Sequence, residues 1–439
     1  MHKLRLSFLL AIAAILTFTA CQKDNNVAEI IVPVISNPGL KNGLDTINVG
    51  ETRVLRPQLT NSKNPTFLWL VNGTVAGTDS TYTFTPAATG DYTISFKVSS
   101  GNSLSSFFYR IKVVDKYDNG FFIVNEGWFG HDGGEVNFYR YGADTLHQRI
   151  FARENPGKTL GTTTEYGAVF NKRLYLVSKQ GPLVVADAYN MKEVGRIAQL
   201  PDAGNAFCGV DNNTGLISTT NGVYPVNLQT LTVGAKINGV IGQVGGMIKA
   251  GNYVLVMSQQ NGIIALNSND FSVAQTLVKA DVGFCQTPDG TVWAAAGKSL
   301  YAINPQTLSV SNIDVPFDVY GSWGAWNAGM LSASTTENAV FIGKTNSWGA
   351  GGREIYKYAV GNPSSLQTPF ATLPAGLELY GAGFRYNPNN NTLIATAVES
   401  GYGDHYQQNT LFIYHAGTGA TQKSIAYTGY FFPAIPVFR

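Results

Sequence analysis

The sequence is poor in cysteine, in charged residues and in helical periodicity. Only three cysteines occur among 439 residues, and a chain of this length buries a core large enough to need no disulfide or structural metal. Charged residues make up 13%, and 30 basic against 28 acidic residues give a net charge of +2, which excludes the concentrated basic surface of a nucleic-acid-binding protein. Apolar residues rarely recur at helical spacing, so the sequence predicts an all-β protein.

Several catalytic and metal-binding motifs are also missing. No Gly-x-Ser-x-Gly sequence is present, and the histidines after residue 20 show no metal-ligand spacing; they are His131, His147, His405 and His415. Cys208 and Cys285 occupy equivalent positions in two copies of an internal sequence repeat, and we expect both to be buried free thiols. We therefore predict no metal, no cofactor and no strong nucleophile.

The first 29 residues have the pattern of an export signal and a tether. A basic start is followed by an apolar run at 6–18, too short for a comfortable transmembrane helix, and by Thr19 and Ala20 before Cys21. This ending resembles a bacterial lipobox, with Phe18 in place of the usual leucine. The resemblance implies a lipoprotein signal peptide at 1–20, diacylated Cys21 and a tether at 21–29; the alternative is an ordinary signal peptide with an incidental cysteine.

Residues 30–115 alternate between apolar and polar positions in at least five short runs separated by Asn-Gly and Thr-Gly turns. This pattern predicts a small β-sandwich. The runs 67–73 and 82–98 resemble PKD and related Ig-like domains of bacterial surface proteins, with Trp69 as the core tryptophan and Gly90 and Tyr92 at a corner. Such a domain serves as a spacer, with carbohydrate binding as the alternative.

From residue 116 to 439 the chain repeats one unit seven times. Each unit has an apolar run, a polar or glycine-rich tip and a returning strand, and the units follow one another at roughly 40 to 50 residues, as in a β-propeller. The apolar runs lie at 121–124, 174–177, 216–218, 254–257, 292–295, 340–343 and 393–396. A second pattern, apolar-Asn-x-x-(Thr/Asp)-apolar-polar-Val, recurs at 226–233, 266–273 and 303–310. We predict a seven-bladed propeller.

The first blade has no inner strand of its own, because 121–124 enters directly as a second strand. The apolar C-terminal segment 430–438 has no later partner. We predict that it supplies the missing inner strand and closes the ring, which removes two exposed sheet edges.

Aromatic residues are concentrated in the loops that the repeat places on one face of the propeller. Aromatic side chains in glycine-rich tips have little core to enter, so they indicate recognition of a ligand. The predicted ligand-binding residues are Trp128, Phe129, Tyr166, Gln259, Trp323, Trp326, Trp348, Tyr380, Tyr402 and Tyr406. For Trp323 and Trp326 the alternative is that they plug the mouth of the central channel.

Three glutamates also fall on this face: Glu126, Glu165 and Glu399. Two carboxylates at a suitable separation hydrolyse a glycosidic bond. Isolated glutamates at a rim are more often solvated or bonded to loop backbone, so we predict a non-enzymatic protein and assign no catalytic residue.

The opening 121–130, the Asn-x-x-Thr-Leu repeats and the ending 432–438 resemble the YVTN-type seven-bladed propeller lipoproteins of Bacteroidota. Some of that family capture cobalamin at the cell surface and pass it to a TonB-dependent outer-membrane channel. The resemblance implies a monomeric, lipid-anchored, surface-exposed outer-membrane protein that binds a nutrient, with a corrinoid as the first candidate. The alternatives are a carbohydrate-binding or carbohydrate-cleaving propeller and a protein-interaction scaffold.

Overall fold

The computed structural model describes residues 30–319, 321–345 and 352–439. Cys21 and Trp348 lie outside the described residues. The chain divides into two compact units, Met1–Val114 and Asp115–Arg439. Both units consist of β-strands with a few short helices, as the sequence predicts.

The first unit is a β-sandwich. One sheet has five strands in the order β2-β9-β8-β5-β6, in which only β2 and β9 run parallel; two-strand ladders β1-β4 and β3-β7 complete the unit. Its elements are β1 (Val34–Asn37), η1 (Lys41–Gly43), β2 (Leu44–Asn48), β3 (Arg53–Leu55), β4 (Gln58–Thr60), β5 (Thr66–Val71), β6 (Thr74–Gly77), β7 (Tyr82–Phe84), β8 (Gly90–Ser100) and β9 (Ser103–Val114).

Trp69 is the centre of the sandwich core, which confirms its predicted place. Its side chain has no exposed surface, its indole N–H donates to the carbonyl oxygen of Asp79 at 2.8 Å, and its ring lies 4.5 Å from that of Phe96. Tyr92 donates its hydroxyl hydrogen to the carbonyl oxygen of Ala88 at 3.0 Å, which fixes the corner before β8. A buried indole with a satisfied N–H contributes both area and specificity to a small core.

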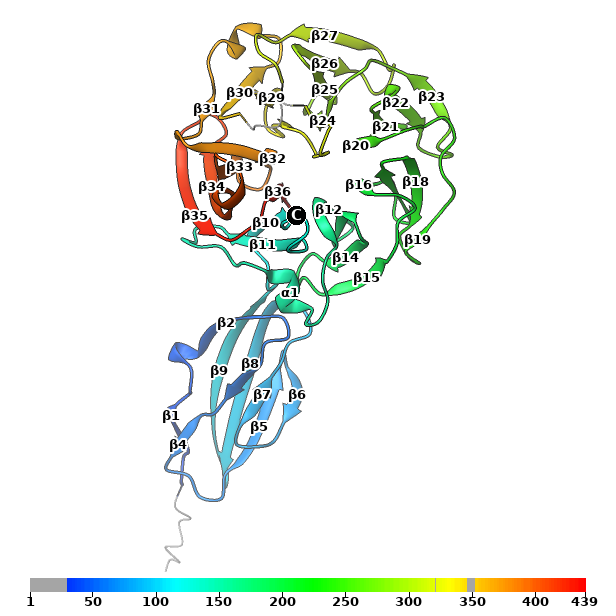
Figure 1. Ribbon diagram of the computed structural model, residues 1–439. Helices are drawn as coiled ribbons and strands as arrows, with labels where there is room; N and C mark the ends of the chain where they lie inside the picture. The colour runs from blue at the N-terminus through cyan, green and yellow to red at the C-terminus, as the bar shows by residue number, and fades with distance from the viewer. Residues whose placement is uncertain (1–29, 320, 346–351) are drawn as a thin grey trace, which may run out of the picture. The chain divides into compact units, whose positions relative to one another are not determined.

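The second unit is a seven-bladed β-propeller (Figure 1). Blade 1 has the strand order β11-β10-β36, and each later blade has four consecutive antiparallel strands. The bounds are, for blade 1, β10 (Gly120–Asn125), β11 (Glu135–Arg140) and β36 (Pro433–Val437); for blade 2, β12 (Thr162–Phe170), β13 (Arg173–Gln180), β14 (Leu183–Asp187) and β15 (Glu193–Ile197); for blade 3, β16 (Gly204–Gly209), β17 (Thr214–Thr219), β18 (Gly222–Asn227) and β19 (Thr232–Val233); for blade 4, β20 (Val244–Ala250), β21 (Tyr253–Ser258), β22 (Gly262–Asn267) and β23 (Val273–Thr276); for blade 5, β24 (Val282–Gln286), β25 (Val292–Ala296), β26 (Ser299–Ile303) and β27 (Val310–Asp314); for blade 6, β28 (Leu331–Ala333), β29 (Ala339–Gly343), β30 (Glu354–Ala359) and β31 (Ala371–Thr372); and for blade 7, β32 (Leu377–Asn387), β33 (Thr392–Glu399), β34 (Gln408–His415) and β35 (Thr421–Thr428). The short helices in the described part of this unit are α1 (Ile150–Glu154), η2 (Pro363–Leu366) and η3 (Gly403–Gln407).

The C-terminal strand closes the ring, as predicted. β36 pairs antiparallel with β10, with Val437 opposite Phe122 and Ile435 opposite Val124. Each inner strand contacts the next around the ring, and β36 contacts both β32 of blade 7 and β12 of blade 2. The last strand in the sequence is therefore the inner strand of the first blade (Figure 1).

The recurring asparagine makes the turn between the third and fourth strands. In blade 3 the Asn227 side-chain oxygen accepts from the backbone N–H groups of Gln229 and Thr230, both at 2.9 Å, and Asn304 does the same in blade 5. The residue four positions after the start of the turn has a positive φ in four blades: Met191, Leu231, Phe271 and Leu308. Its N–H donates to the carbonyl oxygen at the start of the turn, at 2.8 or 2.9 Å. This local bond offsets the cost of the left-handed backbone.

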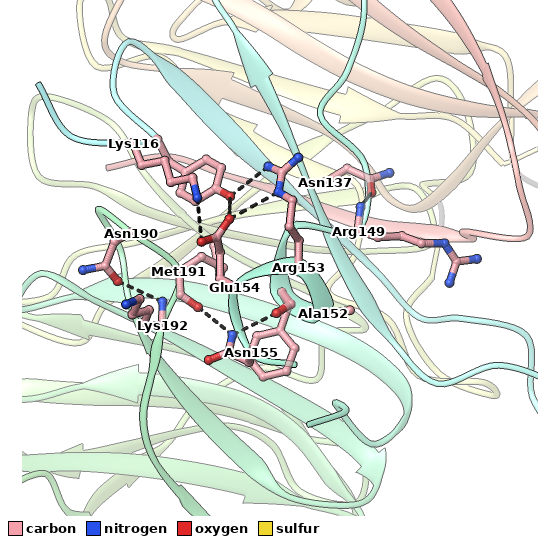
Figure 2. A network of polar contacts seen from close by, with 12 residues as sticks. Lys116, Asn137, Arg149, Ala152, Arg153, Glu154, Asn155, Asn190, Met191 and Lys192 are labelled. Atoms are coloured by element: carbon pink, nitrogen blue, oxygen red, sulfur yellow. Dashed lines mark hydrogen bonds and ion pairs between the residues drawn. The ribbon is translucent and has the colours of Figure 1, made fainter. Parts of the chain in front are cut away.

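A network of charged side chains holds α1 against blade 1 (Figure 2). The Glu154 carboxylate accepts from Lys116 Nζ and from the Tyr117 hydroxyl, both at 2.7 Å, and pairs with Arg153 at 3.2 Å. Asn155 follows at the end of α1, and its Nδ2 donates to the carbonyl oxygen of Met191 in blade 2 at 2.9 Å. These bonds fix the connection between the first two blades.

Candidate functional site

Six aromatic side chains converge where blade 7 meets blade 1. Tyr380 comes from β32; Tyr402 and Tyr406 come from the β33–β34 connection; Trp128 follows β10; and Tyr430 and Phe432 precede β36. We call these six residues the aromatic cluster. Three elements distant in sequence meet here because β36 inserts between β32 and β10, so the cluster depends on closure of the ring.

The rings of the aromatic cluster are in direct contact. Tyr406 lies edge-on to Tyr380, Tyr402 and Phe432 at centroid distances of 5.5 to 5.6 Å. Trp128 stacks on Tyr430 at 4.4 Å. Edge-to-face and offset contacts at these distances stabilise the arrangement beyond the area they bury, so the cluster is held in one geometry.

The outer members of this surface are open to solvent. Tyr402 is 78% exposed and Phe129, one residue after Trp128, is 63% exposed. Tyr406, whose ring contacts that of Tyr402, is only 8% exposed. Exposed rings on a rigid aromatic base are what a ligand with flat apolar faces contacts on binding.

Two carboxyls that interact with each other lie next to the aromatic cluster. They belong to Glu126 and Glu165, and the Tyr380 side chain interacts with Glu126. Lys179 on β13 forms an ion pair with Glu165 at 3.1 Å. We call Glu126 and Glu165 the carboxyl pair. Tyr380 connects it to the aromatic cluster, since its ring contacts Tyr406 and its side chain contacts Glu126.

Irregularities in the inner strands position these groups. In β12 the register with β13 shifts between Thr164 and Tyr166, so Glu165 is the extra residue of a bulge. In β32 the register with β33 shifts between Leu379 and Phe384, and Tyr380 begins the irregular segment. Bulges turn side chains out of the regular alternation of a strand, which brings Glu165 and Tyr380 toward Glu126 at the end of β10.

The carboxyl pair keeps a proton to higher pH than exposed glutamates do. Burial, followed by the negative charge of Glu165, holds the pKa of Glu126 well above its usual value. Burial also raises the pKa of Glu165, although the positive charge of Lys179 opposes the shift. Burial and the nearby Glu126 hold the pKa of Tyr380 well above its usual value, so its hydroxyl stays protonated.

Retaining glycoside hydrolases hold their two carboxyls roughly 5 Å apart, and inverting ones hold them farther apart. Glu399, the third glutamate predicted for this face, instead lies 3.2 Å from His405 Nδ1. Among the residues that the structure describes, no three His, Cys, Asp or Glu side chains are grouped to hold a metal ion.

The remaining predicted residues lie elsewhere on the propeller. Trp326 is only 2% exposed and Tyr166 is partly buried, with the two ring centroids 6.3 Å apart. Trp323 packs partly buried against the same core, while Gln259 is exposed beyond β21. The burial of Trp326 fits the alternative that it plugs the channel.

The sequence-based list omitted Tyr430, Phe432, Lys179 and, inside the channel, Arg385. Tyr430 and Phe432 belong to the closing segment, so the closure prediction contained a signal for them. Phasing of the repeat placed residues 178–180 among the loops of the predicted ligand face, but it did not predict the pairing of Lys179 with Glu165, which depends on the bulge. Cys208 and Cys285 are buried and free, as expected, and burial raises the pKa of Cys208 to about 11.

A hollow of about 530 Å³ lies on the sandwich, over β2, β8 and β9. Its lining includes Asp45, Asp91, Arg110 and Lys112, with Tyr92 as its only aromatic residue. Charged side chains around an open hollow remain hydrated without a ligand, so we favour the aromatic cluster as the binding surface.

Comparison with known proteins agrees with this architecture. A family model described as "Domain of unknown function (DUF5074)" matches residues 119–439, and one described as "PKD-like domain" matches residues 33–100. The crystal structure of a quinoprotein alcohol dehydrogenase-like protein from Bacteroides thetaiotaomicron VPI-5482 is similar with a TM-score of 0.61 and 19% identity, covering 92% of this chain and 99% of that one. At this identity the likeness shows the fold alone.

More distant structural neighbours are the designed protein Ika8 (TM-score 0.44, 10% identity, 71% of this chain and 88% of that one) and the WD40 propeller domain of Doa1 (TM-score 0.41, 9% identity, 63% and 91%). No curated protein matches the sequence. Within the described ranges, no helix is both long enough and apolar enough to cross a membrane.

Proposed function

Since this chain belongs to the family described as domain of unknown function DUF5074, we propose that it is a non-enzymatic, cell-surface lipoprotein whose propeller binds a nutrient. The ligand would bind at the aromatic cluster and be passed to an outer-membrane transporter. The single observation that supports this proposal is the aromatic cluster, on which Tyr402 is exposed, together with the exposed Phe129 that follows Trp128 in the chain. Exposed aromatic rings that adjoin a cluster of other aromatic side chains favour recognition of a ligand.

A corrinoid is the first candidate ligand. A corrin ring offers a broad apolar face, which suits the exposed rings, and a fringe of amides, which suits hydrogen-bonding groups nearby. The Tyr430 hydroxyl donates a hydrogen bond to the Asp404 carboxylate at 2.6 Å, and the Tyr406 hydroxyl donates one to the Glu378 carboxylate at 2.6 Å. Polar groups therefore lie among the rings. Few, well-placed polar groups in an aromatic surround are typical of small-molecule sites.

Binding should depend on the exposed rings. We expect Tyr402→Ala and Phe129→Ala each to weaken the binding of cyanocobalamin about tenfold, because an anchoring aromatic contributes on the order of 1–2 kcal/mol. Isothermal titration calorimetry measures this, and the melting temperature should not change because both side chains are exposed. Phe108→Ala is the matched control, since Phe108 is 56% exposed on the sandwich. Absence of heat with both cyanocobalamin and cobinamide at micromolar concentration would eliminate the corrinoid.

Carbohydrate binding is the second candidate. Sugars stack on aromatic faces, and the Trp128 and Tyr430 rings stack at 4.4 Å. A glycan panel distinguishes the two: retention of an oligosaccharide that Tyr402→Ala abolishes, with no response to corrinoids, would favour the sugar. Product release that depends on Glu126 would favour an enzyme over both.

The proposed anchor depends on Cys21. We expect Cys21→Ser to abolish incorporation of labelled palmitate and to release the protein from the outer-membrane fraction, because only lipidation at this residue holds it there. Cys208→Ser is the control, since Cys208 is a buried free thiol and should leave labelling intact. Palmitate labelling that persists in Cys21→Ser would contradict the lipoprotein assignment.

A further inference from the structure

The central channel of the propeller contains an arginine without an acidic partner. Arg385 lies on β32 of blade 7, and its charge interacts with Tyr166 on β12 of blade 2 and with Cys285 on β24 of blade 5. Blade 5 adjoins neither blade 2 nor blade 7, so side chains from these inner strands interact only across the channel. Arg385 is also only partly exposed, as expected of a side chain that lines a narrow channel.

The backbone satisfies one edge of the guanidinium. Nη1 donates to the carbonyl oxygens of Gly329 at 2.9 Å, Ala382 at 3.1 Å and Phe384 at 2.7 Å, and Nη2 donates to that of Ala328 at 3.3 Å. Nε has no acceptor within the described part of the chain, and Nη2 has one N–H to spare. In a planar guanidinium, Nε–H and one of the two Nη2–H groups lie on the same side.

The charge of Arg385 is not neutralised by its neighbours. None of the described carboxylates forms an ion pair with it, and the titratable groups that interact with its charge are Tyr166 and Cys285. Burial raises the pKa of Tyr166 to about 12 and also raises that of Cys285, so both are neutral at physiological pH. Burial lowers the pKa of Arg385 to about 10, which still leaves it protonated. A charge that is partly withdrawn from water and has no oppositely charged partner costs free energy, and a bound anion would reduce this cost.

We propose that the channel binds a small oxyanion, a carboxylate or a phosphate group, on the free Nε and Nη2 edge of Arg385. Two parallel N–H donors match two oxygens of such a group and give a bidentate, charge-assisted contact. The anion is either free in solution or the acidic group of a larger molecule. This inference does not rest on binding at the aromatic cluster, so either can fail alone.

The other role for Arg385 is purely structural. Its bonds to Ala328 and Gly329 hold the segment that follows Trp326 against blade 7, and Gly329 has a positive φ of 75°. That role uses only the hydrogen bonds from Nη1 and Nη2 to backbone carbonyl oxygens. It does not explain why Nε has no acceptor. The two roles differ in one measurable respect, since only an anion site responds to added anion.

Thermal shift in chloride-free buffer tests the site with inorganic phosphate and, separately, with acetate. We expect saturating anion to raise the melting temperature of the wild type by about 3 °C, the shift for tenfold excess over Kd. In Arg385→Gln, which keeps N–H donors but loses the charge, the shift should fall at least threefold. Arg173→Gln is the matched control because Arg173 Nη1 also donates to a backbone carbonyl, that of Leu228 at 3.0 Å, between blades 2 and 3. A response to phosphate alone assigns the site to phosphate, and a response to acetate assigns it to carboxylates as well.

A second measurement uses only the wild-type protein, in case Arg385→Gln does not fold. Cys285 interacts electrostatically with Arg385, so an anion on Arg385 should slow alkylation of that thiol by repelling its thiolate and blocking access. Peptide mass spectrometry distinguishes Cys285 from the other cysteines. We expect at least threefold slower modification of Cys285 with the effective anion. The proposal is overturned if neither anion shifts the melting temperature nor protects Cys285, or if Arg385→Gln responds as the wild type does.

Discussion

Deletion of residues 433–439 is expected to abolish cooperative folding of the propeller. The deletion removes β36, whose five residues are all buried, and exposes the edge of β10. It also removes the strand that contacts both β32 and β12, so blades 7, 1 and 2 lose their common inner packing. The aromatic cluster should be lost as well, because Phe432 and Tyr430 are held in place by this strand.

The expected loss is comparable with the whole stability of a domain. Burial of Ile435 and Val437 contributes about 1.5–3 kcal/mol each, and the backbone bonds to β10 and the packing against β12 and β32 add to this. A folded domain is stable by only about 5–15 kcal/mol. Near-ultraviolet circular dichroism and limited proteolysis should show loss of fixed tertiary packing in residues 115–432, with exposed apolar surface and aggregation.

Two controls separate closure from a general effect of truncation. Deletion of Arg439 alone removes its ion pair with Asp118 at 2.9 Å but keeps β36, and should lower the melting temperature only slightly. Addition of a peptide spanning residues 430–439 to the truncated chain should restore folding if the strand acts by insertion. A truncated protein that melts at the wild-type temperature would show that the ring does not need its last strand.

The blades and their closure were accessible from the sequence because each signal is local. An apolar run that must be buried, a turn that satisfies its own backbone and a terminal strand with no partner each predict a feature without knowledge of the rest. The turn at Asn304 illustrates this, because its side chain bonds to the next residues in the chain. The same signal was missed in blade 2, where Asp187 replaces asparagine and accepts from Tyr189 and Asn190.

The site was predicted only in outline, because its geometry depends on departures from regular structure. Phasing of the repeat placed Trp128, Tyr380 and Tyr406 on one face, and they do converge with the closing segment. It could not place Glu165 against Glu126, since a single extra residue in β12 decides which way that carboxyl points. Trp326 shows the opposite difficulty: a tryptophan in a glycine-rich segment is expected in solvent, yet its neighbours cover it. Local composition does not reveal which loops fold back over the channel.

Replacement of Lys179 by methionine should destabilise the propeller, and more so at higher pH. Lys179 provides the positive charge beside the carboxyl pair, and its pairing with Glu165 is largely buried. Loss of one partner of a buried ion pair costs about 3–5 kcal/mol, an upper limit here because the carboxyls respond by taking up a proton. Without Lys179 the pKa values of Glu126 and Glu165, already raised by burial, should rise further.

The direction of the pH dependence follows from where the protons are bound. Unfolded glutamates titrate near pH 4.3, whereas the folded pair holds its protons to higher pH. Below about pH 4.3 the two glutamates are protonated in both the folded and the unfolded chain. The stability of Lys179→Met should therefore differ little from that of the wild type at such pH. As the pH rises toward the raised folded-state pKa values, the unfolded chain releases protons that the folded chain keeps, so the stability that this protonation contributes is progressively lost.

Urea unfolding at pH 4.5, 6 and 8 measures this effect as a shift of the midpoint. Lys423→Met is the matched control: its ion pair with Asp144 at 2.6 Å is exposed, so its removal should change the midpoint little at any pH. Combining Lys179→Met with Glu165→Gln should restore most of the lost stability at pH 8, because the uncompensated carboxylate is gone. If the loss in Lys179→Met were the same at all three pH values and persisted in the double variant, Lys179 would act by packing, and the carboxyl pair would not share a proton.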